Sequence, residues 1–311
     1  VARKAGVHVE EGSTGVPMTG DYRTLELFDE PLIVVRGTDG DVSVLSNVCR
    51  HRQAIMLRDR GNIQNIVCPL HRWTYAMDGS LLGAPQFETR PDACLASYPL
   101  QNWRGLLFAG GRDITADLAS VGVEDLIDFD GYRLDHIVMH RCDYNWKTFI
   151  EVYLEDYHVG PFHPGLGQFV SCENLQWQFG DQFSIQTVGI HEDLQKPGTD
   201  IYRRWHEQVL ERNGGKVPRF GAIWMTYYPN IMVEWYPDVL VVSTLIPAGP
   251  QETLNVVEFY YPEEVSLFER KFVEAERAAY METAIEDDEI ARRMDEGRLA
   301  LIKRGAIETG P

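Results

Sequence analysis

The chain has 311 residues, of which 44% are hydrophobic and 24% charged, and its formal net charge at pH 7 is −18. This length allows two domains with sizeable cores, and the acidic balance argues against nucleic acid, because phosphate binding depends on clustered Lys and Arg. The sequence shows no run of about 18 apolar residues, no secretory signal and too few cysteines for a disulfide framework. We therefore expect a cytoplasmic protein without a membrane span.

The first part of the chain reads as a series of short strands. Asp39-Gly40 predicts a hairpin turn between two of them. We therefore expect a small all-β domain over residues 1–115. The expected strands are 24–28, 32–36, 42–46 and 104–108.

Two mixed pairs of metal-binding residues lie within this segment. Cys49 and His51 form the first pair, Cys68 and His71 the second, and the pattern is C-x-H-x16-C-x2-H. In a zinc knuckle, the alternative, cysteines usually pair with cysteines and histidines with histidines. The pattern indicates a Rieske [2Fe–2S] site, in which two thiolates hold one iron and two imidazoles the other. Neutral histidines raise the reduction potential, so the chain is expected to transfer single electrons.

The residues around these pairs resemble the ligand loops of Rieske domains. Ser46-Asn47-Val48 leads into the first loop, and Trp73-Thr74-Tyr75 follows the second. Arg72 is a departure, because such domains usually place glycine after the second histidine. The segment is also locally basic, and we interpret this patch as a surface that steers an acidic electron donor, with a solvated face as the alternative. The patch comprises Arg50, Arg52, Arg58, Arg60 and Arg72.

Beyond residue 115 the pattern predicts an α+β domain over residues 116–311. A helix is expected over 144–159, β-rich segments follow it, and a long helical pattern over 265–303 ends the sequence. The expected strands of this domain are 183–190, 222–228, 231–236 and 239–246.

Two histidines bracket the end of the first of these helices. Glu151, Glu155 and His158 are spaced i, i+4 and i+7, so that one helical face would carry all three. Gly160-Pro161 breaks the helix, which lets the chain turn so that His163 can approach the same metal as His158. A pair of core histidines held by hydrogen bonds is the alternative to a metal site.

A third ligand is expected from the last helix, within Glu286-Asp287-Asp288. Asp287 lines up with Ile290, Ala291 and Met294 on the inward apolar stripe, whereas Asp288 shares its face with charged residues. A carboxylate on that stripe would be costly without a partner. Two histidines and one aspartate form the facial triad that binds non-haem Fe(II) and leaves positions open for dioxygen and substrate.

With both sites present, the whole chain resembles the large subunit of Rieske non-haem iron oxygenases. The resemblance implies a Rieske domain and a helical-grip catalytic domain, with His158, His163 and Asp287 binding the iron. It implies electron delivery from NAD(P)H by a reductase or ferredoxin. It also implies a ring-shaped homotrimer in which an acid, here Glu155, links the first iron histidine to a cluster histidine, here His71, of the neighbouring subunit.

Many family members use aspartate at this bridge, whereas glutamate is familiar from the carnitine, choline and glycine-betaine oxygenases. Glu155 therefore favours hydroxylation or oxidative demethylation of a small organic substrate, with a quaternary amine preferred. Aromatic residues of the second domain would then form a cation–π cage. The alternative is ring hydroxylation of an aromatic acid held by Arg203 or Arg204. The candidate cage residues are Trp205, Trp224, Tyr227, Tyr228, Trp235 and Tyr236.

Two rival classes of protein would each use only one of the two sites. A Rieske electron carrier without oxygenase activity would need no second metal site, and His158, His163 and Asp287 argue against it. A ligand-binding protein on a helical-grip fold would need no cluster, and the cysteine and histidine pairs argue against that.

Overall fold

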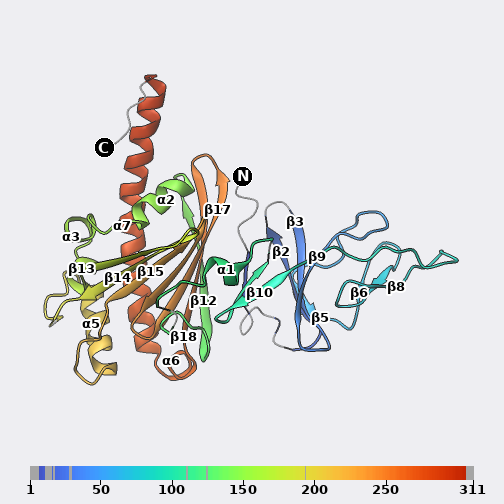
Figure 1. Ribbon diagram of the computed structural model, residues 1–311, viewed down its shortest axis with the longest axis horizontal. Coiled ribbons are helices and arrows are strands. Elements are labelled where there is room, and N and C mark those ends of the chain that lie inside the picture. Colours follow the sequence, from blue (N-terminus) through green and yellow to red (C-terminus); the bar gives the residue numbers. More distant parts are fainter. Residues whose placement is uncertain are drawn as a thin grey trace. The chain divides into compact units, whose positions relative to one another are not determined.

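The computed structural model describes residues 7–10, 16, 18–27, 30–109, 111–123, 125–192 and 194–305. The chain divides into two compact units, Val1–Ala119 and Ser120–Pro311, whose elements are labelled in Figure 1. Of the helices in the described ranges, none combines the length and the apolar character that crossing a membrane requires.

The described part of the first unit contains three antiparallel sheets, and the largest has the order β5-β2-β3-β4-β9. Side chains point alternately to the two faces of a sheet, and successive residues of the middle strand β3 are buried. Both faces of this strand are therefore covered. Ile33 joins the core that contains Cys49 and Cys68, whereas its neighbour Val34 joins a second core on the other face. The strands of this sheet are β2 (Asp21–Leu27), β3 (Glu30–Arg36), β4 (Val42–Ser46), β5 (Arg60–Asn62) and β9 (Ser97–Tyr98).

Two smaller sheets complete the described part of this unit, with the orders β1-β11-β10 and β6-β7-β8. The short helix α1 (Ile114–Asp117) follows them, and the side chain of Asp113 caps it by accepting a hydrogen bond from the N–H of Ala116. The strands are β1 (Val7–Glu10), β6 (Ile66–Val67), β7 (Thr74–Tyr75), β8 (Leu81–Gly83), β10 (Leu100–Trp103) and β11 (Leu106–Ala109).

The prediction of an all-β first domain is confirmed, and so is the hairpin between β3 and β4, where Gly40 has a φ of +90°. The predicted strand 104–108 begins two residues too early. Arg104 and Gly105 both have positive φ, 52° and 89°, and make the turn from β10 to β11. Phe28, at the end of the predicted strand 24–28, lies outside the described residues.

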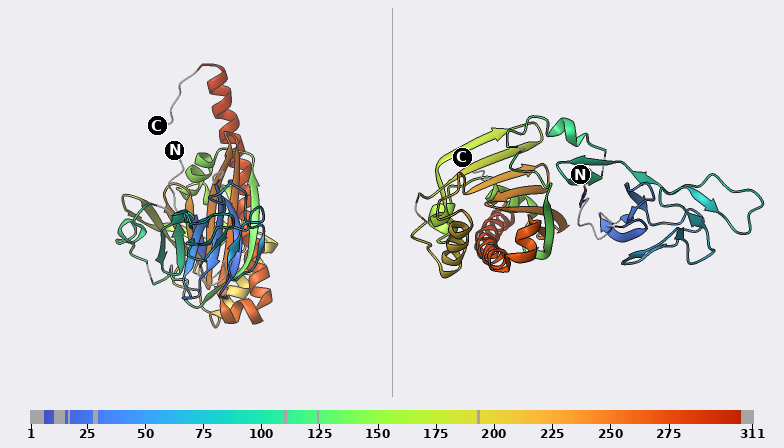
Figure 2. Two further views of the ribbon diagram at one scale, coloured as in Figure 1. Left: turned by 90° about the vertical axis from the view of Figure 1, so that its right-hand side faces the viewer. Right: turned by 90° about the horizontal axis from the view of Figure 1, so that it is seen from below.

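In the second unit, the described strands form one seven-stranded antiparallel sheet with the order β12-β18-β17-β16-β15-β14-β13. Figure 2 shows this sheet curving around α7 (Arg270–Lys303). Helix α5 (Asp200–Arg212) packs on α7 through Trp205 and Phe272, whose ring centroids are 5.0 Å apart. The strands are β12 (Tyr132–Cys142), β13 (Val170–Phe179), β14 (Phe183–Ile190), β15 (Ala222–Tyr227), β16 (Ile231–Tyr236), β17 (Val239–Gly249) and β18 (Glu252–Pro262).

The predicted helix over 144–159 is wrong in its second half, because α2 ends at Tyr153. The carboxylate of Glu155 accepts hydrogen bonds from the N–H groups of Tyr157 and His158, at 2.6 and 3.3 Å, and so replaces the carbonyl partners that a helix would provide. Glu151, Glu155 and His158 therefore do not share one helical face. The other helices are α2 (Trp146–Tyr153), α3 (Val159–Phe162), α4 (Leu166–Phe169) and α6 (Glu263–Phe268).

The other predicted elements of the second unit agree with the structure to different degrees. β14 and β16 have the predicted bounds, while β15 is shorter than predicted by one residue and β17 is longer by three. The long helical pattern is interrupted at Glu269, between α6 and α7. β12, β13, β18 and α5 were not predicted. The expected combination of an antiparallel sheet and a long C-terminal helix is confirmed.

Asp295 ties the start of α2 to α7. Its buried carboxylate accepts hydrogen bonds from the N–H of Asn145, at 2.8 Å, and from the hydroxyl of Thr148. Asn145 in turn caps α2 by accepting from the N–H of Lys147 at 3.0 Å, an interaction that typically stabilises a helix by about 1 kcal/mol. The chain that leads to the two predicted iron histidines thus starts from a fixed point on the helix that carries Asp287.

Candidate metal centres and active-site cavity

Two short loops hold the predicted cluster ligands of the first unit. Cys49 and Cys68 are buried, and the N–H groups of Gln53 and Arg72 close the loops by donating to the two cysteine carbonyls at 3.0 and 3.1 Å. Both closing residues have positive φ, 54° for Gln53 and 63° for Arg72. Glycine adopts this conformation at no steric cost, which explains why it is usual at the position of Arg72.

The side chains of the two loops lie close together. The rings of His51 and His71 have centroids 4.7 Å apart, and His51 stacks on Trp73 at 4.9 Å. The hydroxyl of Tyr75 lies 3.5 Å from Cys49 Sγ. Nδ1 of His51 is buried and finds no hydrogen-bond partner among the described residues. Two buried thiols, two neighbouring imidazoles and an unpaired ring nitrogen fit the donor set of a [2Fe–2S] cluster.

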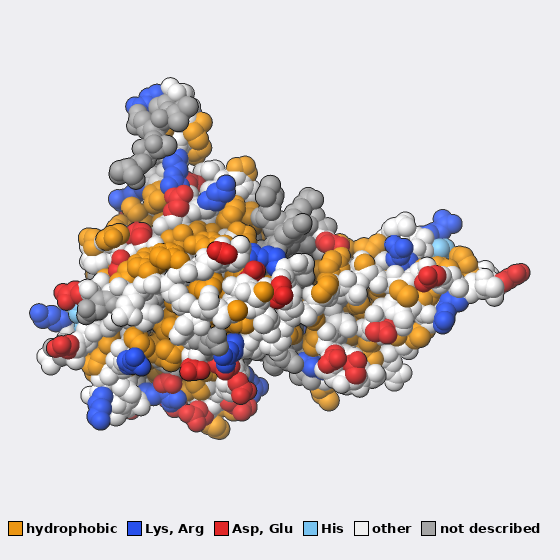
Figure 3. All heavy atoms as spheres, viewed as in Figure 1, with side chains coloured by type: hydrophobic (Ala, Val, Ile, Leu, Met, Phe, Trp, Pro, Cys, Tyr) orange, Lys and Arg blue, Asp and Glu red, His pale blue; other side chains and the backbone are white. Residues whose placement is uncertain are grey.

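All five arginines of the predicted basic patch are exposed. Figure 3 shows Lys or Arg side chains beside a histidine at the end of the first unit where Figure 1 places β6 and β8. The positive charge is therefore at the surface, where a binding partner can reach it.

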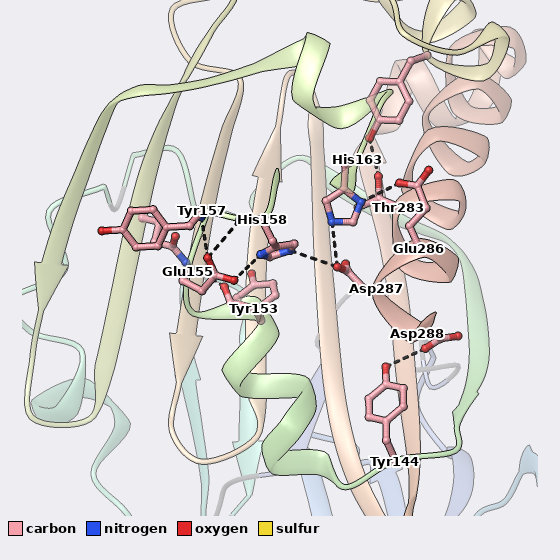
Figure 4. A network of polar contacts seen from close by, with 12 residues as sticks. Tyr144, Tyr153, Glu155, Tyr157, His158, His163, Thr283, Glu286, Asp287 and Asp288 are labelled. Atoms are coloured by element: carbon pink, nitrogen blue, oxygen red, sulfur yellow. Dashed lines mark hydrogen bonds and ion pairs between the residues drawn. The ribbon is translucent and has the colours of Figure 1, made fainter. Parts of the chain in front are cut away.

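The second unit brings together His158, His163 and Asp287 (Figure 4). Oδ1 of Asp287 lies 3.4 Å from Nε2 of His158 and 3.0 Å from Nε2 of His163. One possible ligand atom from each of the three residues lies within 4.8 Å of the others. Oδ1 is buried and, despite these short distances, makes no well-directed hydrogen bond. The arrangement therefore fits three ligands of one metal ion better than a pair of core histidines held by hydrogen bonds.

Two further carboxylates contact the Nδ1 atoms of the two imidazoles, on the side of each ring away from Asp287. Glu155 Oε1 lies 2.5 Å from Nδ1 of His158, and Glu286 Oε2 lies 2.7 Å from Nδ1 of His163. Such partners fix the orientation of metal-binding histidines and leave Nε2 free. Burial lowers the pKa of both histidines, but Asp287 and the outer carboxylates outweigh it and raise the pKa overall. Three carboxylates around two imidazoles leave negative charge that a divalent ion offsets.

The three consecutive acidic residues of α7, 286–288, make different contacts. Asp287 faces the histidines, and Glu286, which the sequence reasoning did not assign, supports His163. Asp288 faces the other way and accepts hydrogen bonds from the hydroxyl of Tyr144 and from Nε2 of His140, each at 2.8 Å. The hydrogen bond that His140 donates to Asp288 raises the pKa of His140 to about 10. In the sequence, the only sign that Glu286 supports His163 is its position next to Asp287.

A cavity of about 960 Å³, counting the space at its mouth, is lined in part by His158, His163 and Asp287. Of the described residues that line it, none is a lysine or an arginine, whereas four are acidic: Glu155, Glu234, Glu276 and Asp287. The cavity therefore has an excess of negative charge. Its aromatic lining residues are Tyr144, Phe149, Tyr153, Phe169, Tyr202, Trp205, Trp224, Tyr236 and Tyr280.

Glu234 and Glu276 are deeply buried, each with 3% of its surface exposed. Burial raises the pKa of Glu234 to about 7 and that of Glu276 to about 8. Relative to an exposed glutamate, keeping Glu234 ionised in the cavity without a cation therefore costs about 3 kcal/mol. Neither residue was predicted, although Glu234 is an acid within the otherwise apolar stretch 231–236, and a buried acid of this kind often marks a functional site.

The substrate-binding residues considered from the sequence have different outcomes. Trp205, Trp224 and Tyr236 line the cavity, whereas the other three cage candidates are not among the described lining residues. Arg203 is about half exposed and pairs with Asp200 and Glu207 on the same helix. Neither Arg203 nor Arg204 lines the cavity, so the expected clamp for an aromatic acid is absent from its described lining.

Comparison with known proteins gives matches to both units. Residues 129–311 match the family described as ring hydroxylating alpha subunit (catalytic domain), and residues 8–99 match the Rieske [2Fe-2S] domain. The chain is 67% identical over 296 residues to Putrescine 2-hydroxylase of Ralstonia nicotianae, covering 95% of this chain and 81% of the relative. It is 58% identical over 311 residues to Putrescine 2-hydroxylase of Bordetella bronchiseptica, covering 95% and 72%.

Among solved structures, a quaternary ammonium Rieske monooxygenase that acts in carnitine oxidation by gut microbiota superimposes with a TM-score of 0.74. The match covers 94% of this chain and 79% of that chain at 20% sequence identity, so it shows the fold alone.

The fold and the two metal sites define an oxygenase that joins an iron–sulfur cluster to a mononuclear iron. The chain belongs to the family of ring-hydroxylating alpha subunits, the Rieske oxygenases. The expected family is confirmed, and so are the oxidoreductase class and the two cofactors, a Rieske [2Fe–2S] cluster and a mononuclear iron. Enzymes of this family receive electrons from NAD(P)H through a reductase or ferredoxin.

Replacing Glu286 by alanine should weaken iron binding by about 10- to 100-fold, because the Nδ1 atom of His163 loses its partner. Chelator competition followed by iron analysis would measure this, with the visible absorbance of the cluster as an internal reference. Glu289→Ala is the matched control, because Glu289 lies on the same helix and pairs with Arg293 at the surface. Equal iron affinity in the two variants would contradict the role assigned to Glu286.

Proposed function

We propose that the protein is a terminal oxygenase that hydroxylates a C–H bond of a small aliphatic amine. One observation carries the proposal: Glu234 and Glu276 are buried in the cavity beside the metal site, and no described lysine or arginine lines it. A buried carboxylate without a cation is costly, and an ammonium group of the substrate would offset that cost. The relatives named Putrescine 2-hydroxylase support the proposal, since putrescine (1,4-diaminobutane) has an ammonium group at each end.

The residues that the sequence predicted are the proposed ligands of both cofactors. The cluster belongs to a domain of residues 1–115 and the iron to a domain of residues 116–311. When bound, the cluster supplies single electrons and the iron supplies a position for dioxygen activation. The proposed cluster ligands are Cys49, His51, Cys68 and His71, and the proposed iron ligands are His158, His163 and Asp287.

The remaining side chains of the site position the reacting groups. Glu155 and Glu286 hold the protons on Nδ1 of the two histidines, which keeps both Nε2 atoms turned toward Asp287. The aromatic walls exclude water and strengthen electrostatic interactions inside the cavity. Glu234 and Glu276 attract the positive charge of the amine into the cavity that the metal site borders.

Glu155 is suited to join subunits in a ring-shaped homotrimer. Its side chain is 37% exposed although it contacts His158, and the neighbouring Tyr157 is 87% exposed. His71 is exposed on the first unit. Glu155 would accept a hydrogen bond from His71 of the partner subunit and so link one metal site to the other.

The electron donor is an acidic reductase or ferredoxin that docks on the exposed arginine patch. None of the five cysteines, which all lie in the described ranges, forms a disulfide, which suits the reducing cytoplasm as the place of action.

The substrate class is tested by supplying the iron-loaded protein and a surrogate reductase with 1,4-diaminobutane, carnitine, glycine betaine and an aromatic acid. We expect coupled consumption of NADH and O2 with the diamine, and a product heavier by one oxygen atom without formaldehyde. Hydroxylation of a carbon that bears no nitrogen leaves a stable alcohol, whereas attack on an N-methyl group releases formaldehyde. Formaldehyde released from a methylated amine, or a hydroxylated aromatic ring as the product, would contradict this proposal.

Glu155→Gln should keep both metal centres and slow electron transfer between them, because the amide is a weaker acceptor for two imidazole N–H groups. Single-turnover kinetics of a pre-reduced cluster would show the change, and iron content would show that both sites are loaded. Glu151→Gln is the control, because Glu151 pairs with Arg298 and lies outside the cavity lining. Unchanged turnover by Glu155→Gln would rule out the bridge.

Amine binding should strengthen as the pH rises from about 6 to about 8.5, because an amine with a pKa near 10 stays charged while the two buried carboxyls ionise. The pKa of Glu234 is about 7 and that of Glu276 about 8, and burial is the main cause in both. The KM of the diamine measured across this range would show the trend, and Glu234→Gln should flatten it. A KM that does not change with pH would contradict the proposed role of these carboxylates.

A further inference from the structure

Glu234 lies on β16 and lines the cavity, and the described groups that donate hydrogen bonds to its carboxylate are neutral. The hydroxyl of Tyr236 donates to Oε2 at 2.8 Å, and the hydroxyl of Tyr280 donates to Oε1 at 3.0 Å. Trp224 Nε1 donates to the Tyr236 hydroxyl at 3.1 Å and holds it in place. These donors orient the carboxylate, but none of them neutralises its charge.

Two other polar groups at the cavity wall, each able to accept a hydrogen bond, find no partner among the described residues. Asn255 is 2% exposed, and its Oδ1 is buried without a hydrogen bond, while its Nδ2 donates to Ser243 Oγ at 3.5 Å. The hydroxyl oxygen of Tyr153 is also buried without a partner. A primary ammonium group has three N–H donors and no acceptor, so it complements this set. A quaternary ammonium group has no N–H and would leave the acceptors unpaired.

Glu276 adds a second buried carboxyl group farther from the metal site. It lines the same cavity from α7 and accepts a hydrogen bond from the hydroxyl of Tyr261 at 2.5 Å. Arg277 follows it in the chain and lowers its pKa slightly, but burial dominates. At 1.5 Å per residue, Tyr280 lies about 10 Å and Glu276 about 16 Å before Asp287 along the helix axis. The order along the cavity is therefore Asp287, Glu234 with its partner Tyr280, and then Glu276.

We propose that Glu234, together with Asn255, binds one primary ammonium group of the substrate and that Glu276 balances the charge of a second one, so that the cavity selects a primary diamine. This inference rests on the proposed function of amine hydroxylation. The nitrogens of extended 1,4-diaminobutane are about 6 Å apart, judged from standard bond lengths. Tyr280, which donates to Glu234, lies about one turn of α7 from Glu276, a rise of about 6 Å, so the two carboxyl groups meet the cavity at neighbouring levels of the helix.

Isothermal titration of the iron-loaded protein without O2 separates binding from turnover. The probes are 1,4-diaminobutane, butylamine and the fully N-methylated diamine. For the wild type we expect the diamine to bind about 100-fold more tightly than butylamine, with the methylated diamine also weak. Glu276→Gln should weaken the diamine by about this factor and leave butylamine nearly unchanged, whereas Glu234→Gln should weaken both.

Glu274→Gln is the matched control, because Glu274 lies two residues from Glu276 on the exposed side of α7. It should change none of the affinities by more than about twofold. Thermal unfolding would verify that all variants are folded. Equal losses for diamine and butylamine in Glu276→Gln, or a wild type that does not prefer the diamine, would overturn the inference. Diamine binding without hydroxylation would leave the inference standing and refute the proposed function.

Discussion

Negative charge that is buried without a fixed cation is the constraint on which the second unit depends. Asp287 lies between two histidines that are themselves backed by Glu155 and Glu286, and Glu234 lies farther inside. A divalent iron offsets the first group, and a bound cation would offset the second. Since a ligand that binds only the folded state stabilises it by mass action, folding, metal loading and substrate binding share one electrostatic balance in this unit.

Helix α7 carries several of the residues on which this charge distribution depends. Glu276, Tyr280, Asp287 and Asp295 all lie on α7, and each reaches a different part of the unit: the inner cavity, the partner of Glu234, the metal site and the start of α2. The curved sheet surrounds this helix and supplies the opposing wall (Figure 2). The spacing of Asp287 and Glu276 is therefore set by helix geometry rather than by flexible loops.

The parts of the protein that the sequence could predict are those whose chemistry is local. The cluster pairs, the two histidines around Gly160-Pro161 and the acid at Asp287 follow from residue type and spacing. β12 could not be placed, because its partner β18 is far away in sequence, and the edge strand β13, although it pairs with the adjacent β14, lacks the continuous apolar run of β15. The helix predicted through His158 ends early because a side chain competes for its backbone, and Glu234 is recognisable as part of the cavity only once the sheet folds around α7.

The arrangement of α7 also limits how this enzyme can change during evolution. An α-helix turns by about 100° per residue, so one residue inserted between Glu276 and Asp287 would turn one of them away from the cavity. Substrate preference can therefore drift through exchanges at positions such as Ala279 and Thr283, which line the same face, but not through changes in the length of this stretch. Changes in chain length are easier to absorb in the connections between strands, which lie at the surface.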